Sequence, residues 1–190
     1  FQICLWSRLA NRVLLQLGKW DGKDGDSIYQ NAREFPWQDH LQSNQTFAIS
    51  FHGTNQHIRH PHYGSQRLKD GLVDHFRDST GIRPNVDPKN PEVSFWAHLE
   101  ADQLKLSLDF SGVSLHQRGY RQHQGSTSLK ENLAAALLWQ CGWPMKAKHG
   151  DTLLDPMCGS GTILAEGLLI AADWAPGLIR KKFGFQAWRG

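Results

Sequence analysis

The residues with the clearest chemical potential lie in the segment Asp155-Pro-Met-Cys-Gly-Ser-Gly-Thr162. Gly159 and Gly161 allow the backbone to turn sharply and to approach a ligand, and the amides of a following helix favour polar or anionic groups. Asp155 stands beside this turn, where its carboxylate could pair with the ammonium of an amino-acid-like cofactor. The segment lacks the Gly-Lys-Ser/Thr of a Walker loop and the third glycine of the dinucleotide fingerprint. It therefore predicts a cofactor loop of another kind.

A second group of residues combines positive charge with an aromatic ring, as RNA-binding surfaces do. Arginine and lysine contact phosphates, and an aromatic face stacks on unpaired bases. The candidates are Arg59, Tyr63, Arg67, Lys69 and Arg83. A solvated helix face is the alternative for single residues such as Lys69, because the same helix carries several acids. Four further cations follow the last acidic residue of the chain. They could contact RNA or belong to a solvated loop, and the sequence favours neither interpretation. They are Arg180, Lys181, Lys182 and Arg189.

Histidine and cysteine spacing does not predict a metal site. The clustered histidines are His52, His57, His60 and His62. They include no helical i,i+4 pair and no nearby Cys or Asp ligand set, so we expect no metal. The three cysteines, Cys4, Cys141 and Cys158, are odd in number and too far apart for a CxxC site. This pattern favours a reducing, cytoplasmic setting.

The composition is that of a folded, mildly basic protein. The 190 residues are 39% hydrophobic and 21% charged, with a formal net charge of +3 at pH 7. This length predicts one full domain and a smaller unit. No apolar run reaches the roughly 18 residues of a membrane helix, so a membrane-spanning protein is not expected. The first residue is Phe1, which suggests a piece cut from a longer protein.

The first half of the chain predicts a small α/β unit. Residues 6–15 have an apolar face at helical spacing and predict a helix, with an optional passage into a strand near Leu17. Residues 46–51 predict a strand. An amphipathic helix starts near Tyr63, because apolar residues then recur at steps of three and four. Alternating residues predict a hairpin whose strands are 92–99 and 104–110.

The second half predicts the elements that position the glycine loop. Residues 113–128 are polar and predict a linker. Residues 129–139 predict a helix, 151–155 a short strand that ends at the acid, and 163–172 a second helix. Helix, strand, glycine loop and helix is how a nucleotide-binding α/β sheet begins.

These motifs together resemble a known family. Asp155 to Thr162 resembles motif I of S-adenosylmethionine-dependent methyltransferases, in the DPMCGSGT spelling of enzymes that modify guanines in RNA. The flanking segments 115–121 (LHQRGYR), 129–134 (LKENLA) and 173–178 (DWAPGL) are similar to the bacterial 23S ribosomal RNA large-subunit guanine methyltransferases of the K/L bifunctional type. Residues 46–110 resemble the THUMP domain that precedes the catalytic domain there.

The resemblance implies an α/β fold, a methyl donor and an RNA partner. It implies that S-adenosyl-L-methionine binds along Asp155, Pro156, Cys158, Gly159, Ser160, Gly161 and Thr162, and that 23S rRNA is bound by the THUMP part. The implied regions are the end of an N-terminal α/β region at 1–45, a THUMP-like domain at 46–112, a linker at 113–128, and the first strand and helices of a Rossmann-like methyltransferase domain at 129–190. The family's Asn/Asp-Pro-Pro-Tyr motif is absent, so no catalytic residue is assigned and the chain alone is expected to be inactive.

Two other functions remain open at this point. In a non-catalytic RNA-binding module, such as that of a tRNA-modifying protein, the glycine loop would only close a truncated sheet. A DNA adenine methyltransferase shares the cofactor loop, although the THUMP-like region disfavours it. An Asn/Asp-Pro-Pro-Tyr motif in sequence that follows Gly190 would identify the enzyme.

Overall fold

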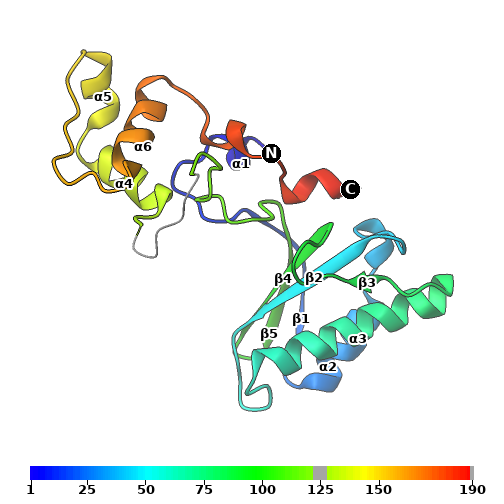
Figure 1. Ribbon diagram of the computed structural model, residues 1–190. Coiled ribbons are helices and arrows are strands. Elements are labelled where there is room, and N and C mark those ends of the chain that lie inside the picture. The colour runs from blue at the N-terminus through cyan, green and yellow to red at the C-terminus, as the bar shows by residue number, and fades with distance from the viewer. Residues whose placement is uncertain (122–127, 189–190) are drawn as a thin grey trace. The chain divides into compact units, whose positions relative to one another are not determined.

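The computed structural model describes residues 1–121 and 128–188, which form two compact units (Figure 1). The sheet unit contains Leu14–Gly112 and the segment that starts at Gly184. The helical unit contains Phe1–Val13 and Val113–Phe183. The chain therefore starts in the helical unit, passes through the sheet unit and returns, so each unit is assembled from segments that are distant in sequence.

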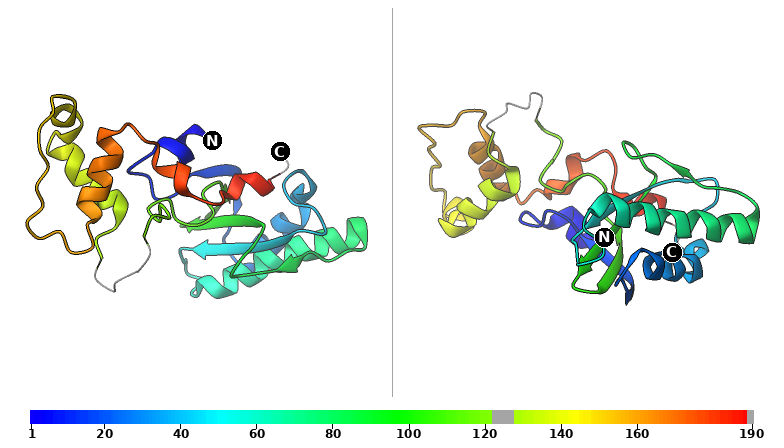
Figure 2. Two further views of the ribbon diagram at one scale, coloured as in Figure 1. Left: turned by 45° about the horizontal axis from the view of Figure 1, so that its top comes forward. Right: turned by 90° about the horizontal axis from the view of Figure 1, so that it is seen from below.

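A five-stranded sheet organises the sheet unit, with strand order β1-β5-β4-β2-β3. The strands are β1 (Leu14–Asp21), β2 (Thr46–His52), β3 (Asn85–Val86), β4 (Val93–Glu100) and β5 (Gln103–Asp109). β5 pairs antiparallel with β1 and β4, and β2 pairs parallel with β3 and β4. The helices α2 (Gly25–Glu34) and α3 (Pro61–Thr80) lie side by side on one face (Figures 1 and 2). A short 3-10 helix, η1 (Trp37–Asp39), follows α2.

The core of this unit lies between the sheet and the two helices. Alternate residues of β4 and β5 are buried there, and so is the apolar side of α3, where Leu68, Leu72, Val73 and Phe76 are each at most 4% exposed. The expected hairpin and the expected amphipathic helix are therefore confirmed. The helix begins at Pro61, a residue suited to a first helical turn because its missing N–H has no partner there anyway.

The beginning of the chain differs from the expectation. The helix predicted over 6–15 is wrong: α1 spans Gln2–Trp6, and residues from Leu14 onward form β1. β1 is paired along β5, with Leu15 opposite Leu108 and Trp20 opposite Leu104. This tertiary pairing outweighs the local helical spacing, which is only a weak preference. The expected division at residue 45 also does not coincide with the compact units, because β1 and α2 belong to the same sheet unit as β2 to β5.

Besides α1, the helical unit contains three α-helices, the last of which begins directly after the glycine loop. They are α4 (Glu131–Gln140), α5 (Trp143–Lys148) and α6 (Thr162–Ala171). Their small core is formed by Leu138, Trp143 and Ile170, and the indole N–H of Trp143 donates to the Gly167 carbonyl at 2.8 Å. Two short 3-10 helices follow, η2 (Pro176–Ile179) in this unit and η3 (Gly184–Ala187) in the sheet unit. The helices expected over 129–139 and 163–172 are thus confirmed within two residues.

The strand expected over 151–155 is wrong. Residues 151–155 have no regular secondary structure, and no other described segment pairs with them. Leu154 is 82% exposed. A strand needs a hydrogen-bonded neighbour, which a local apolar pattern cannot supply by itself.

Candidate functional site

The loop that joins Asp155 to α6 turns at two glycines. Gly159 and Gly161 have φ angles of +53° and +74°, in the left-handed region where a side chain is strained. A Cβ atom at either position would meet nothing within 4 Å, so backbone conformation rather than space favours glycine here. The Asp155 carboxylate accepts a hydrogen bond from the Met157 N–H at 3.1 Å. The loop is therefore exposed and accessible to a ligand.

A cavity of about 410 Å³ lies against this loop, a size typical of small-molecule sites. Its lining residues are Ser128, Leu129, Asp155, Met157, Cys158, Gly159, Ser160, Thr162 and Ile163. Five of the seven residues expected to bind the cofactor are among them; Pro156 and Gly161 are in the same loop but do not line the cavity. The lining combines one carboxylate, the two hydroxyls of Ser160 and Thr162 at 3.2 Å from each other, and glycine backbone. This set can accept hydrogen bonds from an ammonium group and donate to polar atoms of a ligand.

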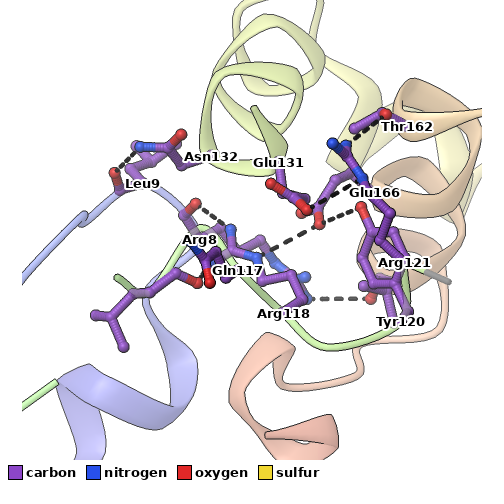
Figure 3. Close-up of polar contacts among 12 residues, drawn as sticks. Arg8, Leu9, Gln117, Arg118, Tyr120, Arg121, Glu131, Asn132, Thr162 and Glu166 are labelled. Carbon is purple, nitrogen blue, oxygen red and sulfur yellow. Dashed lines mark hydrogen bonds and ion pairs between the residues drawn. The ribbon is translucent and has the colours of Figure 1, made fainter. Parts of the chain in front are cut away.

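A buried ionic network joins residues 118–120 to α6, the helix that begins after the loop (Figure 3). Arg118 is 1% exposed, and its Nε lies 3.4 Å from the Oε1 of Glu166, which is fully buried on α6. The Tyr120 hydroxyl donates to the same oxygen at 3.2 Å. Arg118 also donates to the carbonyls of Leu115, at 2.7 Å, and Arg8. Residues 115–121 are therefore bound to α6, whereas a linker was expected; residues 122–127 of that expected linker lie outside the described residues.

Electrostatics in this network follow from burial. Burial raises the pKa of the Glu166 carboxyl, and the positive charge of Arg118 opposes that rise. Burial and the nearby Glu166 raise the pKa of the Tyr120 hydroxyl, so it stays a neutral donor at physiological pH. The sequence reasoning missed this network. Its signal is an acid within the apolar run Ile163–Ala172, because a carboxylate on an otherwise apolar helix needs a buried partner.

Arg121 connects this network to the cavity. Its Nη2 donates to the Thr162 Oγ1 and to the Leu129 carbonyl, both at 2.9 Å, and its Nε lies 3.5 Å from the Glu131 carboxylate (Figure 3). Thr162 and Leu129 both line the cavity. Arg121 therefore fixes two parts of the cavity wall.

The N-terminal segment adds a further support. Arg8 donates from Nη2 to the carbonyls of Leu169, at 3.0 Å, and Trp174, at 2.9 Å, at the C-terminal end of α6. Asn132 donates to the Leu9 carbonyl at 3.3 Å (Figure 3). Residues 1–13 thus help to hold α4 and α6, although nothing in their local sequence pattern indicates this.

The five expected RNA-binding residues do not form one patch. Tyr63, Arg67 and Lys69 lie on α3, whereas Arg59 precedes this helix and Arg83 follows it. The helix has 20 residues, which at 1.5 Å per residue separate its ends by about 30 Å. Arg59, Tyr63 and Arg83 are exposed.

Two of the expected cations on α3 already have partners within the sheet unit. Arg67 donates to the Asp26 carboxylate at 2.7 Å and lies over the ring of Tyr29 at 4.8 Å. Lys69 is paired with Asp70 at 2.8 Å. Arg59 and Arg83 are therefore better placed than Arg67 and Lys69 to contact a phosphate.

The described residues provide neither a metal cluster nor a membrane-spanning helix. In that part of the chain, His, Cys, Asp and Glu residues form no group of three or more that could hold a metal ion. Nor does it contain a helix with the length and apolar character that crossing a membrane requires.

Two family models match successive parts of the chain. The THUMP domain model matches residues 22–109, and the model described as "RMKL-like, methyltransferase domain" matches residues 118–189. The first match starts well before residue 46 and includes α2, in agreement with the extent of the sheet unit. The second contains the 118–121 segment, the glycine loop and the helices α4, α5 and α6.

Curated relatives match along the whole chain. The ribosomal RNA large subunit methyltransferase K/L of Allochromatium vinosum is 51% identical over 188 residues, which are 99% of this chain and 26% of the relative. The protein of the same name from Pseudomonas aeruginosa is 50% identical over 190 residues, 100% of this chain and 26% of the relative. The chain therefore spans about a quarter of the length of these relatives.

Solved structures show the same fold. A predicted N6-adenine-specific DNA methylase from Listeria monocytogenes superimposes with a TM-score of 0.80 at 28% identity, covering 97% of this chain and 47% of that protein. A protein crystallised in complex with SAH superimposes with a TM-score of 0.79 at 26% identity, covering 97% of this chain and 48% of that protein. Both similarities extend over the sheet unit and the helical unit.

Proposed function

Because this chain is a homologue of the ribosomal RNA large subunit methyltransferases K/L, with a THUMP domain followed by the start of an RMKL-like methyltransferase domain, we propose that it is part of an S-adenosyl-L-methionine-dependent 23S rRNA guanine-N2 methyltransferase. The observation that carries this proposal is the glycine loop with its adjoining cavity, in the same chain as an RNA-binding domain. We also propose a cytoplasmic location for this protein. All three cysteines are free thiols, as is usual in a reducing compartment.

The residues of the loop fit the proposed methyl donor. The Asp155 carboxylate offers an acceptor for the ammonium of an amino acid, and the glycines leave room for a ligand against the backbone. The cofactor would be held by Asp155, Pro156, Cys158, Gly159, Ser160, Gly161 and Thr162, in a cavity that Ser128 and Leu129 also line. When bound, S-adenosyl-L-methionine supplies an activated methyl group to the attacking amine of guanine.

The chain's own contribution to the reaction is binding and orientation. Arg121 fixes the Thr162 side chain, and the Arg118–Glu166 pair fixes α6, which begins at the loop. Holding two reactants in line removes an entropic barrier from the chemical step. No residue of the described chain is assigned to proton transfer, so the contribution of this part is to present the donor in a defined position.

Methyl transfer to purified RNA tests the proposed function. The full-length protein that carries this chain should transfer labelled methyl groups from S-adenosyl-L-methionine to protein-free 23S rRNA, with the label on guanine N2. Label on DNA adenine instead would favour a DNA methylase, as the Listeria relative is named. RNA binding without cofactor binding would favour a non-catalytic module.

RNA affinity of the THUMP part should depend strongly on salt. Neutralising Arg59, Arg67 and Arg83 together should weaken RNA binding and reduce the slope of log K against log salt by about 0.7 to 0.9 for each phosphate that is no longer neutralised. Most of this change should come from Arg59 and Arg83, because Arg67 is already paired with Asp26. A salt titration with a ribosomal RNA hairpin measures the slope.

The control is Arg33→Gln combined with Arg77→Gln, which is compared with the double neutralisation of Arg59 and Arg83 as well as with the triple variant. These cations lie on α2 and α3, but each is paired with an acid, Asp78 at 2.7 Å and Asp74 at 2.9 Å respectively. These two substitutions should therefore leave the slope of log K against log salt close to that of the wild type. Equal slopes for the triple variant and the wild type would show that these arginines do not contact RNA phosphates.

A further inference from the structure

A second cavity, of about 320 Å³, lies in the helical unit on the other side of Arg121. We call it the basic pocket and define it by Gln117, Arg118, Gly119 and Arg121 on one wall and Arg180, Lys181 and Lys182 on the other. Val113, Glu131 and Ile179 complete its lining. Two segments about 60 residues apart in sequence therefore form it. Neither segment alone indicates a pocket.

The walls of the basic pocket are fixed by short contacts. Arg180 donates to the backbone carbonyls of Val113, at 2.6 Å, Ser114, at 2.9 Å, and Gln117, at 2.7 Å. Gly119 has a φ angle of +103°, and a Cβ there would lie 3.3 Å from the Ile179 carbonyl oxygen. Glycine at this position therefore allows the two segments to approach closely, and the pocket is preformed.

The charges around the pocket are unbalanced in favour of cations. Its lining contains five cations and one acid, Glu131. Glu131 already lies against Arg121, and the nearby Glu166 lies against Arg118. Lys181 and Lys182 are exposed and form no ion pair with any residue that the structure describes. Two lysines therefore remain available to an anion that enters the pocket.

We propose that the basic pocket binds a backbone phosphodiester of the RNA substrate, next to the nucleotide to be methylated. Lysine binds phosphate as a point charge, and a phosphodiester is the anion that an RNA strand presents at every nucleotide. This proposal rests on the proposed function, whose substrate is RNA, and adds a contact outside the THUMP domain.

The position of the basic pocket relative to the cofactor loop supports this assignment. Arg121 lines the basic pocket, and its Nη2 donates at 2.9 Å to the Oγ1 of Thr162, which lines the cofactor cavity. The two cavities of the helical unit thus share this pair as a boundary. A phosphate held in the basic pocket therefore lies across the Arg121–Thr162 pair from the cofactor cavity, and this contact would orient the RNA strand as well as strengthen its binding.

The test compares two double variants of the full-length protein. Lys181→Ala with Lys182→Ala removes the charge of the pocket, whereas Lys146→Ala with Lys148→Ala removes the same charge from exposed positions of α5 in the same unit. Binding of a 23S rRNA fragment is measured across a salt series, and S-adenosyl-L-methionine binding is measured by calorimetry. Inorganic phosphate is added as a competitor in a separate arm.

The pocket variant should bind the rRNA fragment several-fold more weakly and with a salt slope reduced by about 0.7 to 0.9 for each lysine that had neutralised a phosphate. Its cofactor affinity and the RNA affinity of the α5 variant should match the wild type. Equal slopes for the two variants overturn the proposal, and so does equal loss of cofactor binding. Inorganic phosphate that binds the wild type and the α5 variant but not the pocket variant, with equal RNA salt slopes in all three, identifies a free-phosphate site and overturns the proposal. The proposed function itself is refuted if the wild-type protein neither binds nor methylates rRNA. The salt slope of the pocket variant tests only the phosphate contact.

Discussion

Replacing Arg118 with alanine is expected to lower the free energy of unfolding of the helical unit by about 3 to 5 kcal/mol, the range measured when one partner of a buried ion pair is removed. Glu166 is fully buried, and without Arg118 its carboxylate loses its ion-pair partner and retains the hydrogen bond from the Tyr120 hydroxyl. The same change removes the hydrogen bonds to the Leu115 and Arg8 carbonyls. The segment that carries Arg121 should therefore loosen together with α6.

Hydrogen exchange followed by mass spectrometry measures this effect within the full-length protein, because it reports the opening of α6 separately from other parts. The control is Arg33→Ala, which removes an exposed arginine paired with Asp78 and should change exchange little. Arg118→Met combined with Glu166→Leu removes both charges and should recover a large part of the loss. Equal exchange of α6 in Arg118→Ala and Arg33→Ala would contradict a stabilising role for the buried pair.

Asp155→Ala and Gly159→Val are each expected to weaken S-adenosyl-L-methionine binding at least tenfold, which corresponds to about 1.4 kcal/mol. The first removes the carboxylate proposed to pair with the ammonium, a charge-assisted contact. The second places a β-branched residue at a φ angle of +53°, which such a residue adopts only with strain. A Cβ there meets no atom of the chain within 4 Å, so the loss should come from a changed loop and an obstructed ligand.

Calorimetry on the full-length protein measures both affinities. Two variants outside the cavity are matched controls: Asp151→Ala removes an exposed acid from the same segment, and Gly150→Val introduces the same side chain at a φ angle of +83° with nothing within 4 Å. Both controls should bind the cofactor like the wild type. Unchanged binding by Asp155→Ala and Gly159→Val would refute the assignment of this loop to the methyl donor.

The sequence by itself determined those features that depend on neighbours along the chain. The alternation in residues 92–99 and 104–110, the helical spacing from Leu68 to Phe76 and the glycines at 159 and 161 each specify a local conformation. The structure contains the expected hairpin and α3, and both glycines adopt the positive φ angles of a sharp turn. The THUMP and methyltransferase assignments also follow from contiguous motifs, and the family models match those regions.

Only the tertiary structure decided the features that need a distant partner. Residues 14–21 form β1 because they pair with β5. Residues 151–155 form no strand because no described segment pairs with them. Arg118, in an expected linker, is buried because Glu166, 48 positions away, lies against it. Arg67 is paired because α2 presents Asp26 to α3. A charged side chain is paired within the protein only where the fold places an opposite charge close to it. The spacing of residues along the sequence does not give the distance between two side chains in the folded chain.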